Sequence, residues 1–104
     1  EVNIGSIDDP IVEAAFYKIQ GDIALLDGNT DYALSFYRQA ESSSKGPSFK
    51  VKYQLDVISI LINQAEFDRA SKLLNNILNI DDVGYNEKNK AEELLAFVNQ
   101  KLGT

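Results

Sequence analysis

The sequence contains no cysteine and no histidine among its 104 residues. Without cysteine, the chain forms no disulfide, offers no thiol nucleophile and builds no cysteine-based zinc site. Without histidine, it also lacks the commonest general base and the commonest transition-metal ligand of proteins. Histidine-dependent catalysis is therefore excluded, and we predict that the protein is not an enzyme and uses no cofactor.

Proline and glycine are scarce, and long apolar runs are missing. With two prolines and six glycines, the chain has room for long helices. Its longest apolar stretch, residues 57–62, is interrupted by Ser59 and is far shorter than the roughly 18 residues of a membrane span. Methionine is absent as well, even at position 1. We interpret the chain as a trimmed or processed piece, which is compatible with a signal segment or membrane anchor before Glu1.

Basic residues are in the minority. Ten Lys and Arg stand against sixteen Asp and Glu, which gives a formal net charge of −6. An acidic protein repels the phosphate backbone of nucleic acids. The basic residues are scattered, with Lys45, Lys50 and Lys52 as the nearest approach to a cluster. We therefore expect no nucleic-acid partner.

The length and composition predict a single all-α domain. A content of 44% hydrophobic and 25% charged residues is ordinary for a folded globular chain, and 104 residues suit one domain. Hydrophobic periodicity predicts a flexible lead-in over 1–9 and a single domain over 10–104. Its five helices are expected at 10–27, 29–43, 48–64, 67–80 and 85–102.

The first predicted helix carries clear signals at both ends. Asp9 suits the N-cap position, and Pro10 suits the first helical position, where its missing N–H costs nothing. Gly28 suits the left-handed residue that closes a helix.

One face of this first helix is predicted to be buried. Its apolar side chains recur at the three- and four-residue spacing of a buried stripe, and they are Phe16, Ile19, Ile23 and Leu26. Gly21 interrupts the pattern at a cost of about 1 kcal/mol relative to alanine in an exposed helix. A glycine here indicates that another helix passes close by.

The segment 48–64 allows two interpretations. Apolar and polar residues alternate over 51–57 as in a strand. The segment nevertheless continues for about 16 residues without a turn signal, which is long for a strand. A helical stripe also fits, and Ser48 suits its N-cap. We predict a helix.

Two parts of the chain resemble each other at a distance of 37 residues. The equivalent positions are Ala33 and Ala70, Tyr37 and Leu74, and Ala40 and Ile77. A helix pair that recurs at roughly 30–40 residues is typical of helical solenoids, because one pair cannot bury its apolar faces alone whereas stacked pairs can.

In its first helix pair the chain resembles the tetratricopeptide repeat (TPR) family. The family has small and aromatic residues at set places, and the matching residues here are Gly21, Gly28, Ala33, Tyr37 and Ala40. Tyr32 lies one or two places from the usual aromatic position. The resemblance implies a TPR-like α-solenoid, with repeat one over about 10–47, repeat two over about 48–82 and a capping helix over about 85–102.

The second helix pair departs further from the family pattern. Phe67, Ala70 and Leu74 match, whereas Ile58 stands in place of a small residue and Ala65 in place of the turn glycine. The usual closing proline is absent from both repeats. The spacing of 37 residues, instead of the family's roughly 34, fits an insertion in the loop around 42–47.

Three stretches are also similar to one bacterial branch of this family, namely GDIALLDGNTDYALSFYRQA, YQLDVIS and KAEELLAFV. That branch comprises membrane-anchored TPR-like proteins of the cell envelope that associate with the Sec translocon. The resemblance implies a bacterial periplasmic or envelope location ahead of a cytoplasmic one, and a membrane contact only through a segment outside this chain.

Two patterns in the sequence resemble a metal site and a catalytic site, but both are incomplete. Asp27, Asn29 and Asp31 have the spacing of the first ligands of a calcium loop, but Tyr32 and Arg38 occupy the places of its glycine and its final glutamate. Paired carboxylates such as those at 81–82 and 92–93 come without a nucleophile or an orienting partner. We expect neither a metal site nor a catalytic site.

The TPR resemblance implies a groove on the first helices of the two pairs. Its residues, carried over by alignment, are Lys18, Asp22, Leu25, Lys52, Leu55, Ser59 and Asn63. The set lacks the paired basic residues that clamp a peptide carboxylate, so an apolar helix-in-groove mode is favoured. The alternative is that the last helix fills the groove.

The predicted function is a non-catalytic protein–protein interaction module, either a scaffold or a chaperone-type adaptor that binds a protein or peptide. The alternative is self-association, as a homo-oligomerisation domain of a larger envelope protein in which the groove or the 51–62 face pairs with its copy. A chain of so few repeats makes this alternative credible.

Overall fold

The computed structural model of the protein describes residues 9–103. Over these residues the chain is all-α, as predicted. Its five helices are α1 (Pro10–Leu26), α2 (Thr30–Ser43), α3 (Pro47–Asn63), α4 (Phe67–Leu78) and α5 (Tyr85–Leu102). The predicted flexible lead-in falls almost entirely on residues 1–8, outside the described part, and Asp9 is already the N-cap of α1.

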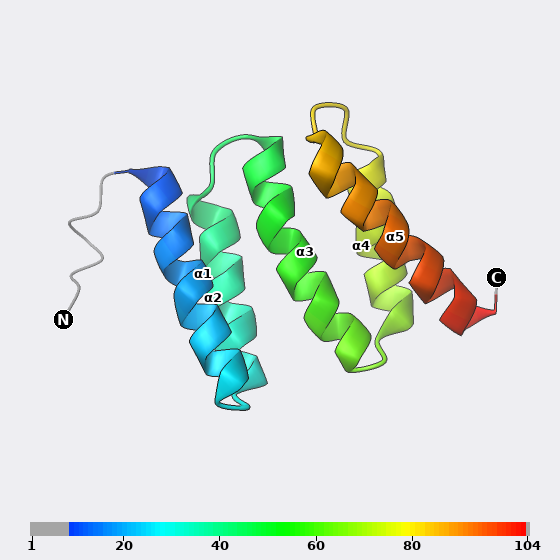
Figure 1. The fold of residues 1–104 in the computed structure, drawn as a ribbon, viewed down its shortest axis with the longest axis horizontal. Coiled ribbons are helices and arrows are strands. Elements are labelled where there is room, and N and C mark those ends of the chain that lie inside the picture. The colour runs from blue at the N-terminus through cyan, green and yellow to red at the C-terminus, as the bar shows by residue number, and fades with distance from the viewer. Residues whose placement is uncertain (1–8, 104) are drawn as a thin grey trace.

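The helices form two layers (Figure 1). In this view α1, α3 and α5 lie in front, and α2 and α4 lie behind them. Each helix packs against its neighbours in the sequence, and α3 also touches α5. The domain is a slab of 47 × 33 × 16 Å. We call the outer surface of α1, α3 and α5 the front face.

The ends of the first helix are as predicted. The Asp9 carboxylate accepts a hydrogen bond from the Ile11 N–H at 2.9 Å, and α1 ends at Leu26. Gly28 follows with φ +77°, the left-handed conformation that lets the chain turn back into α2. The helix N-cap and the closing glycine are confirmed.

The central helix α3 is buried on most of its circumference, because α2 packs on one side of it and α4 and α5 on the other. Its buried residues are Val51, Tyr53, Leu55, Val57, Ile58, Ile60 and Leu61. This burial explains why the segment combines a strand-like alternation with a helical stripe. The predicted helix is confirmed.

The predicted N-cap of this helix is wrong. The helix begins at Pro47 after Gly46, and no side chain caps it. Ser48 instead accepts a hydrogen bond from the Gly84 N–H at 2.8 Å and donates one to the Asp82 carbonyl at 3.3 Å. Its hydroxyl therefore ties the loop between α4 and α5 to the start of α3.

The predicted buried stripe of α1 is also wrong. The buried residues of this helix are Ala14, Gly21 and Ala24. Within the predicted stripe, Phe16 is half-buried, and the exposed fractions are 55% for Ile19, 49% for Ile23 and 88% for Leu26. The reason is that the small face of α1, and not its bulky face, lies against α2.

The close approach of α1 and α2 at Gly21 is confirmed. A Cβ atom added at this glycine would lie 2.5 Å from Cε1 of the buried Tyr37 ring. The glycine therefore makes room for the aromatic ring at the crossing of the two helices.

The two hairpins α1–α2 and α3–α4 repeat the same layout 37 residues apart. The equivalent pairs Ala33 and Ala70, Tyr37 and Leu74, and Ala40 and Ile77 are all buried. The turns agree too, since Ala65 has φ +60° where the first hairpin has Gly28. The internal repeat seen in the sequence is thus a repeat of structure. No helix within residues 9–103 combines the length and the apolar character needed to cross a membrane.

The left-handed turns give a reciprocal prediction. A left-handed conformation costs an L-residue about 1–2 kcal/mol, which exceeds the entropy that glycine adds to the unfolded chain. We expect Ala65→Gly to raise the free energy of unfolding by about 0.5–1 kcal/mol and Gly28→Ala to lower it by a similar amount. Urea unfolding of both variants checks this, and equal signs for the two changes would contradict it.

The helix crossing gives a second prediction. Gly21→Ala would stabilise an exposed helix by about 1 kcal/mol, but overpacking against a buried ring costs about 1–3 kcal/mol. We expect a net loss of up to about 2 kcal/mol in thermal or urea unfolding. The loss should shrink in the background of Tyr37→Leu, which places at the crossing the residue type that the second hairpin has at Leu74. An unchanged loss in that background would rule out the ring as the cause.

Candidate interaction site

The predicted groove residues lie on α1 and α3, which are neighbours in the front layer (Figure 1). Four of the seven are exposed on this face, namely Leu25, Lys52, Ser59 and Asn63. Lys18 and Asp22 are half-buried between the two helices, whereas Leu55 is buried in the core. The structure therefore brings six of the seven to the surface, and the assignment of the set as a partner groove stays a prediction.

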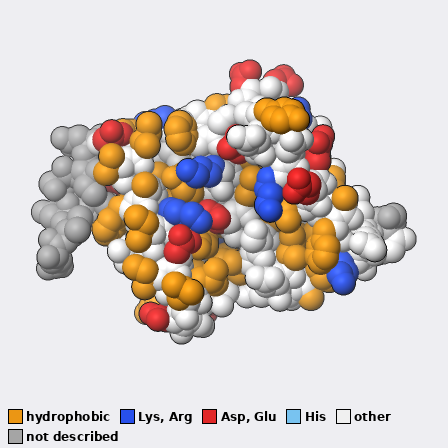
Figure 2. Space-filling model, in the orientation of Figure 1, with side chains coloured by type: hydrophobic (Ala, Val, Ile, Leu, Met, Phe, Trp, Pro, Cys, Tyr) orange, Lys and Arg blue, Asp and Glu red, His pale blue; other side chains and the backbone are white. Residues whose placement is uncertain are grey.

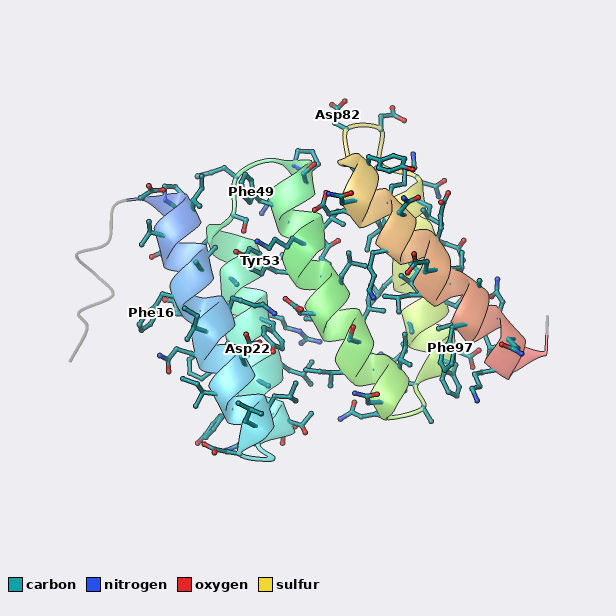
Figure 3. The ribbon with its side chains drawn as sticks, viewed as in Figure 1. Phe16, Asp22, Phe49, Tyr53, Asp82 and Phe97 are labelled. Atoms are coloured by element: carbon teal, nitrogen blue, oxygen red, sulfur yellow. The ribbon has the colours of Figure 1, made fainter. Side chains whose placement is uncertain are left out.

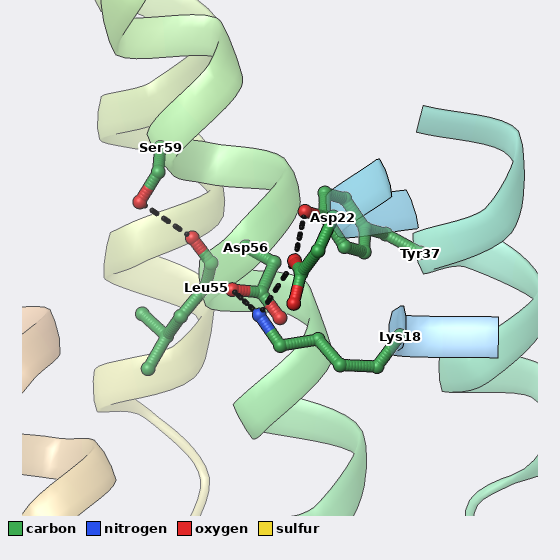
Figure 4. A network of polar contacts seen from close by, with 6 residues as sticks. All are labelled: Lys18, Asp22, Tyr37, Leu55, Asp56 and Ser59. Carbon is green, nitrogen blue, oxygen red and sulfur yellow. Dashed lines mark hydrogen bonds and ion pairs between the residues drawn. The ribbon is translucent and has the colours of Figure 1, made fainter. Parts of the chain in front are cut away.

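A polar network joins α1, α2 and α3 beneath this face (Figure 4). The Lys18 ammonium donates to Oδ1 of Asp56 at 3.0 Å and to Oδ1 of Asp22 at 3.2 Å. The Tyr37 hydroxyl donates to the same Asp22 oxygen at 2.6 Å, and the Lys18 nitrogen lies 5.2 Å from the centre of the Tyr37 ring. One lysine thus links two carboxylates from different helices. Asp56 and Tyr37 belong to this site, although the sequence prediction did not include them.

The Asp56 carboxyl is the most perturbed acid of the network. Burial raises its pKa, and the charge of Asp22 adds to the rise, while the hydrogen bond and charge of Lys18 oppose it. Its Oδ2 atom is buried and has no hydrogen-bond partner among the described residues. Burial lowers the pKa of Lys18, but the two carboxylates outweigh it and raise that pKa overall. The network therefore stabilises the charged form of Lys18, whereas burial disfavours the charged form of Asp56.

The Tyr37 phenol is held in its neutral, donating form. Burial raises its pKa, and the hydrogen bond to Asp22 raises it further. This phenol is consequently not a base, and it serves to hold the Asp22 carboxylate toward α3. Asp22 itself lies between α1 and α3 in Figure 3.

A hollow of about 240 Å³ lies on the opposite side of the slab, between α2, α3 and α4. Its polar rim includes Arg38, Glu41 and Gln54. The Gln54 amide donates to the Glu41 carboxylate at 2.7 Å, so that carboxylate is already engaged. The lining contains no pair of nucleophile and base, and the hollow carries no argument for catalysis.

The most apolar exposed surface lies on α1. Figure 2 shows hydrophobic side chains gathered over this helix. We call this surface the α1 edge, and it consists of the exposed Ile11, Val12, Ile19, Ile23 and Leu26 with the half-buried Phe16. It points away from the side that buries Ala14, Gly21 and Ala24. The sequence prediction missed this surface because it took the bulky residues for the packed face.

A signal for the α1 edge was nevertheless present in the sequence. Helix α1 carries two faces that both lack charge, one small and one bulky. Small residues allow two helix backbones to approach closely, so the small face is the one expected at a tight crossing. The glycine that predicted such a crossing, Gly21, lies on that small face.

Comparisons of the chain with protein-family models, with curated proteins and with solved structures find no match. The TPR resemblance therefore rests on the residues named above. Function has to be argued from the surfaces of this chain.

The network predicts a specific pH dependence. The pKa of Asp56 is raised above its ordinary value of 3.8, so the folded chain binds this proton more readily than the unfolded chain does. Between those two pKa values stability then falls as pH rises. Relative to the Asp56→Asn variant, which does not titrate here, the wild type should gain stability when the pH is lowered from 7 toward 4.

Urea unfolding of both proteins at several pH values measures this difference directly. The carboxyls outside the network are common to the two proteins, so their contributions cancel in the comparison. Asp22 and Lys18 interact with Asp56, and the difference therefore reports the titration of the whole network. A wild type that loses stability relative to Asp56→Asn on acidification would contradict the assignment.

Proposed function

We propose that the protein is a non-catalytic protein–protein interaction module of a TPR-like helical-repeat type, acting as a scaffold or a chaperone-type adaptor. The α1 edge carries this proposal. Contiguous exposed apolar surface is uncommon on monomeric proteins and marks interaction sites. Here at least five large apolar side chains on one helix are more than a third exposed, with Leu26 at 88%.

The repeated hairpins support the TPR-like part of the proposal. Equivalent positions 37 residues apart share their burial, and the two turns share a left-handed residue. Stacked hairpins of this kind are the units from which helical solenoids form their binding surfaces.

The strip of the front face between α1 and α3 is a second surface for a partner. Helix α5 packs on α3 and α4, so the strip between α1 and α3 lies beside α5 and not beneath it. Leu25 supplies an apolar contact there, and Lys52 supplies a positive charge. A helical segment lying along this strip would use the groove residues predicted from the sequence.

Self-association is the second candidate function, because the α1 edge of one molecule can meet that of another. The 51–62 face is not available for such pairing, since most of its apolar side chains lie inside the domain. Sedimentation or light scattering at high concentration separates this candidate from binding to a different protein.

A peptide selection tests the proposed function. A displayed library of helical peptides is selected on the wild-type protein, and the enriched peptides are then tested on three variants. These are Ile19→Asp with Ile23→Asp for the α1 edge, Leu25→Asp with Lys52→Glu for the strip between α1 and α3, and Leu73→Asp as a matched control. Leu73 is 38% exposed on α4 and belongs to neither surface.

We expect peptides with apolar residues at helical spacing to be enriched, and their binding to fall at least about tenfold with one of the two surface variants but not with the control. A tenfold change corresponds to about 1.4 kcal/mol, within reach of two buried apolar contacts. Circular dichroism of each variant verifies its helicity. No enrichment, or binding that ignores both surface variants, would refute the proposal.

A further inference from the structure

The apolar side chains of the α1 edge follow a heptad spacing. Val12, Phe16, Ile19, Ile23 and Leu26 are separated by steps of four, three, four and three residues. This is the a/d pattern by which two helices pack side by side, with Phe16 and Ile23 at a positions and the others at d. The seam runs from Val12 to Leu26 of the 17-residue helix α1, and it is about 21 Å long at 1.5 Å per residue.

The internal repeat shows that the same face is covered by helices elsewhere in the molecule. Thirty-seven residues after Phe16, Ile19 and Ile23 come Tyr53, Asp56 and Ile60 of α3. Tyr53 and Ile60 are each 3% exposed, and Asp56 bonds to Lys18 of α1. On α3 the central part of this face lies against the first hairpin, while Phe49 and Asn63, the equivalents of Val12 and Leu26, are exposed. On α1 the equivalent face has no described helix over it.

The border of the α1 edge is acidic. From Asp9 to Asp31 the chain holds five carboxylates and one basic residue, Lys18. Asp9 caps α1, Asp22 bonds to Tyr37 and Lys18, and Asp31 lies on α2. Glu13 and Asp27 are therefore the carboxylates that flank the seam. Lys18 already bonds to Asp22 and Asp56. In the heptad frame Glu13 and Asp27 occupy e positions, where flanking charges select the partner of a helix pair.

This charge distribution decides between occupants. A second copy of the chain would bring the same carboxylates to the seam, and like charges across an interface oppose association. A helix with lysine or arginine at its own e and g positions would bring opposite charges instead. Both occupants could pack on the apolar seam, so the charges that flank it favour the basic helix over a second copy of the chain.

We propose that the α1 edge binds an amphipathic partner helix with an apolar heptad seam and basic flanks. This inference rests on the proposed interaction function and adds the chemistry of the partner. Phe16, Ile19 and Ile23 form the centre of the contact, while Glu13 and Asp27 orient the basic flank.

Two synthetic helical peptides of three heptads test the proposal. Both carry leucine and isoleucine at a and d, and they differ by having lysine or glutamate at e and g. Fluorescence anisotropy should show the lysine peptide binding the wild-type protein at least about tenfold more tightly at low salt. The preference should shrink at high salt, as expected for screened charges.

Matched variants separate the α1 edge from a general attraction to an acidic protein. Glu13→Lys with Asp27→Lys should reverse the preference toward the glutamate peptide. Asp81→Lys with Asp82→Lys changes the net charge equally in the exposed loop before α5 and should leave the preference in place. Ile19→Asp with Ile23→Asp should abolish binding of the lysine peptide.

Three outcomes would overturn the proposal. They are equal affinity for the two peptides, an equal effect of the two lysine swaps, and a dimer of the chain alone that Ile19→Asp with Ile23→Asp dissolves. If the library selection yields binders while the lysine preference fails, the partner chemistry is wrong and the interaction function stands. If the selection also yields nothing, both fall.

Discussion

The crossing of α1 on α2 at Gly21 and Tyr37 determines the rest of the structure. The absence of a side chain at Gly21 lets the Tyr37 ring lie directly against the α1 backbone. Once that small face is turned inward, the rotation of α1 about its axis is set. The bulky row from Val12 to Leu26 then points outward, because it lies on the opposite side of a helix with 3.6 residues per turn.

The same crossing prepares the contact with the next hairpin. The Tyr37 hydroxyl reaches Asp22 at 2.6 Å, and Lys18 links Asp22 to Asp56 of α3. A buried tyrosine therefore positions a carboxylate, which positions a lysine, which holds the next helix. A partly buried carboxylate is costly unless it is paired. Asp56 therefore favours the arrangement of α1 and α3 in which Lys18 lies opposite it over arrangements that leave it unpaired. We regard this network as a device that aligns the two hairpins more than as a source of net stability.

The two hairpins share a layout but differ in what covers their first helix. On α3 the face with Tyr53 and Ile60 packs against the first hairpin and is buried. On α1 no helix of residues 9–103 covers the equivalent face, which keeps a heptad of apolar side chains with acidic flanks. A hairpin in a stack has an apolar face wherever a neighbouring hairpin would pack, and within the described residues α1 has no such neighbour. The exposed side chains of the α1 edge are apolar.

The sequence alone determined the five helices, both ends of the first helix and the repeat. Local signals suffice for these features, because a helix start depends on Asp9 and Pro10 and a turn depends on Gly28, within a few residues of the chain. The period of 37 residues was likewise visible in the spacing of Ala33 and Ala70. The prediction of Ser48 as an N-cap was wrong because a hydroxyl can bond to several partners. Its actual partner at Gly84 lies 36 residues away, beyond the reach of local sequence signals.

Only the tertiary structure decided which face of α1 is buried and which polar residues meet. Periodicity identifies an apolar face, but it does not distinguish packing within the domain from exposure to a partner, since both require the same residues. The choice depended on the fit of Gly21 to Tyr37 across two helices. In the same way, Lys18 and Asp56 are 38 residues apart, and their bond follows from the stacking of the hairpins and from no local pattern in the chain.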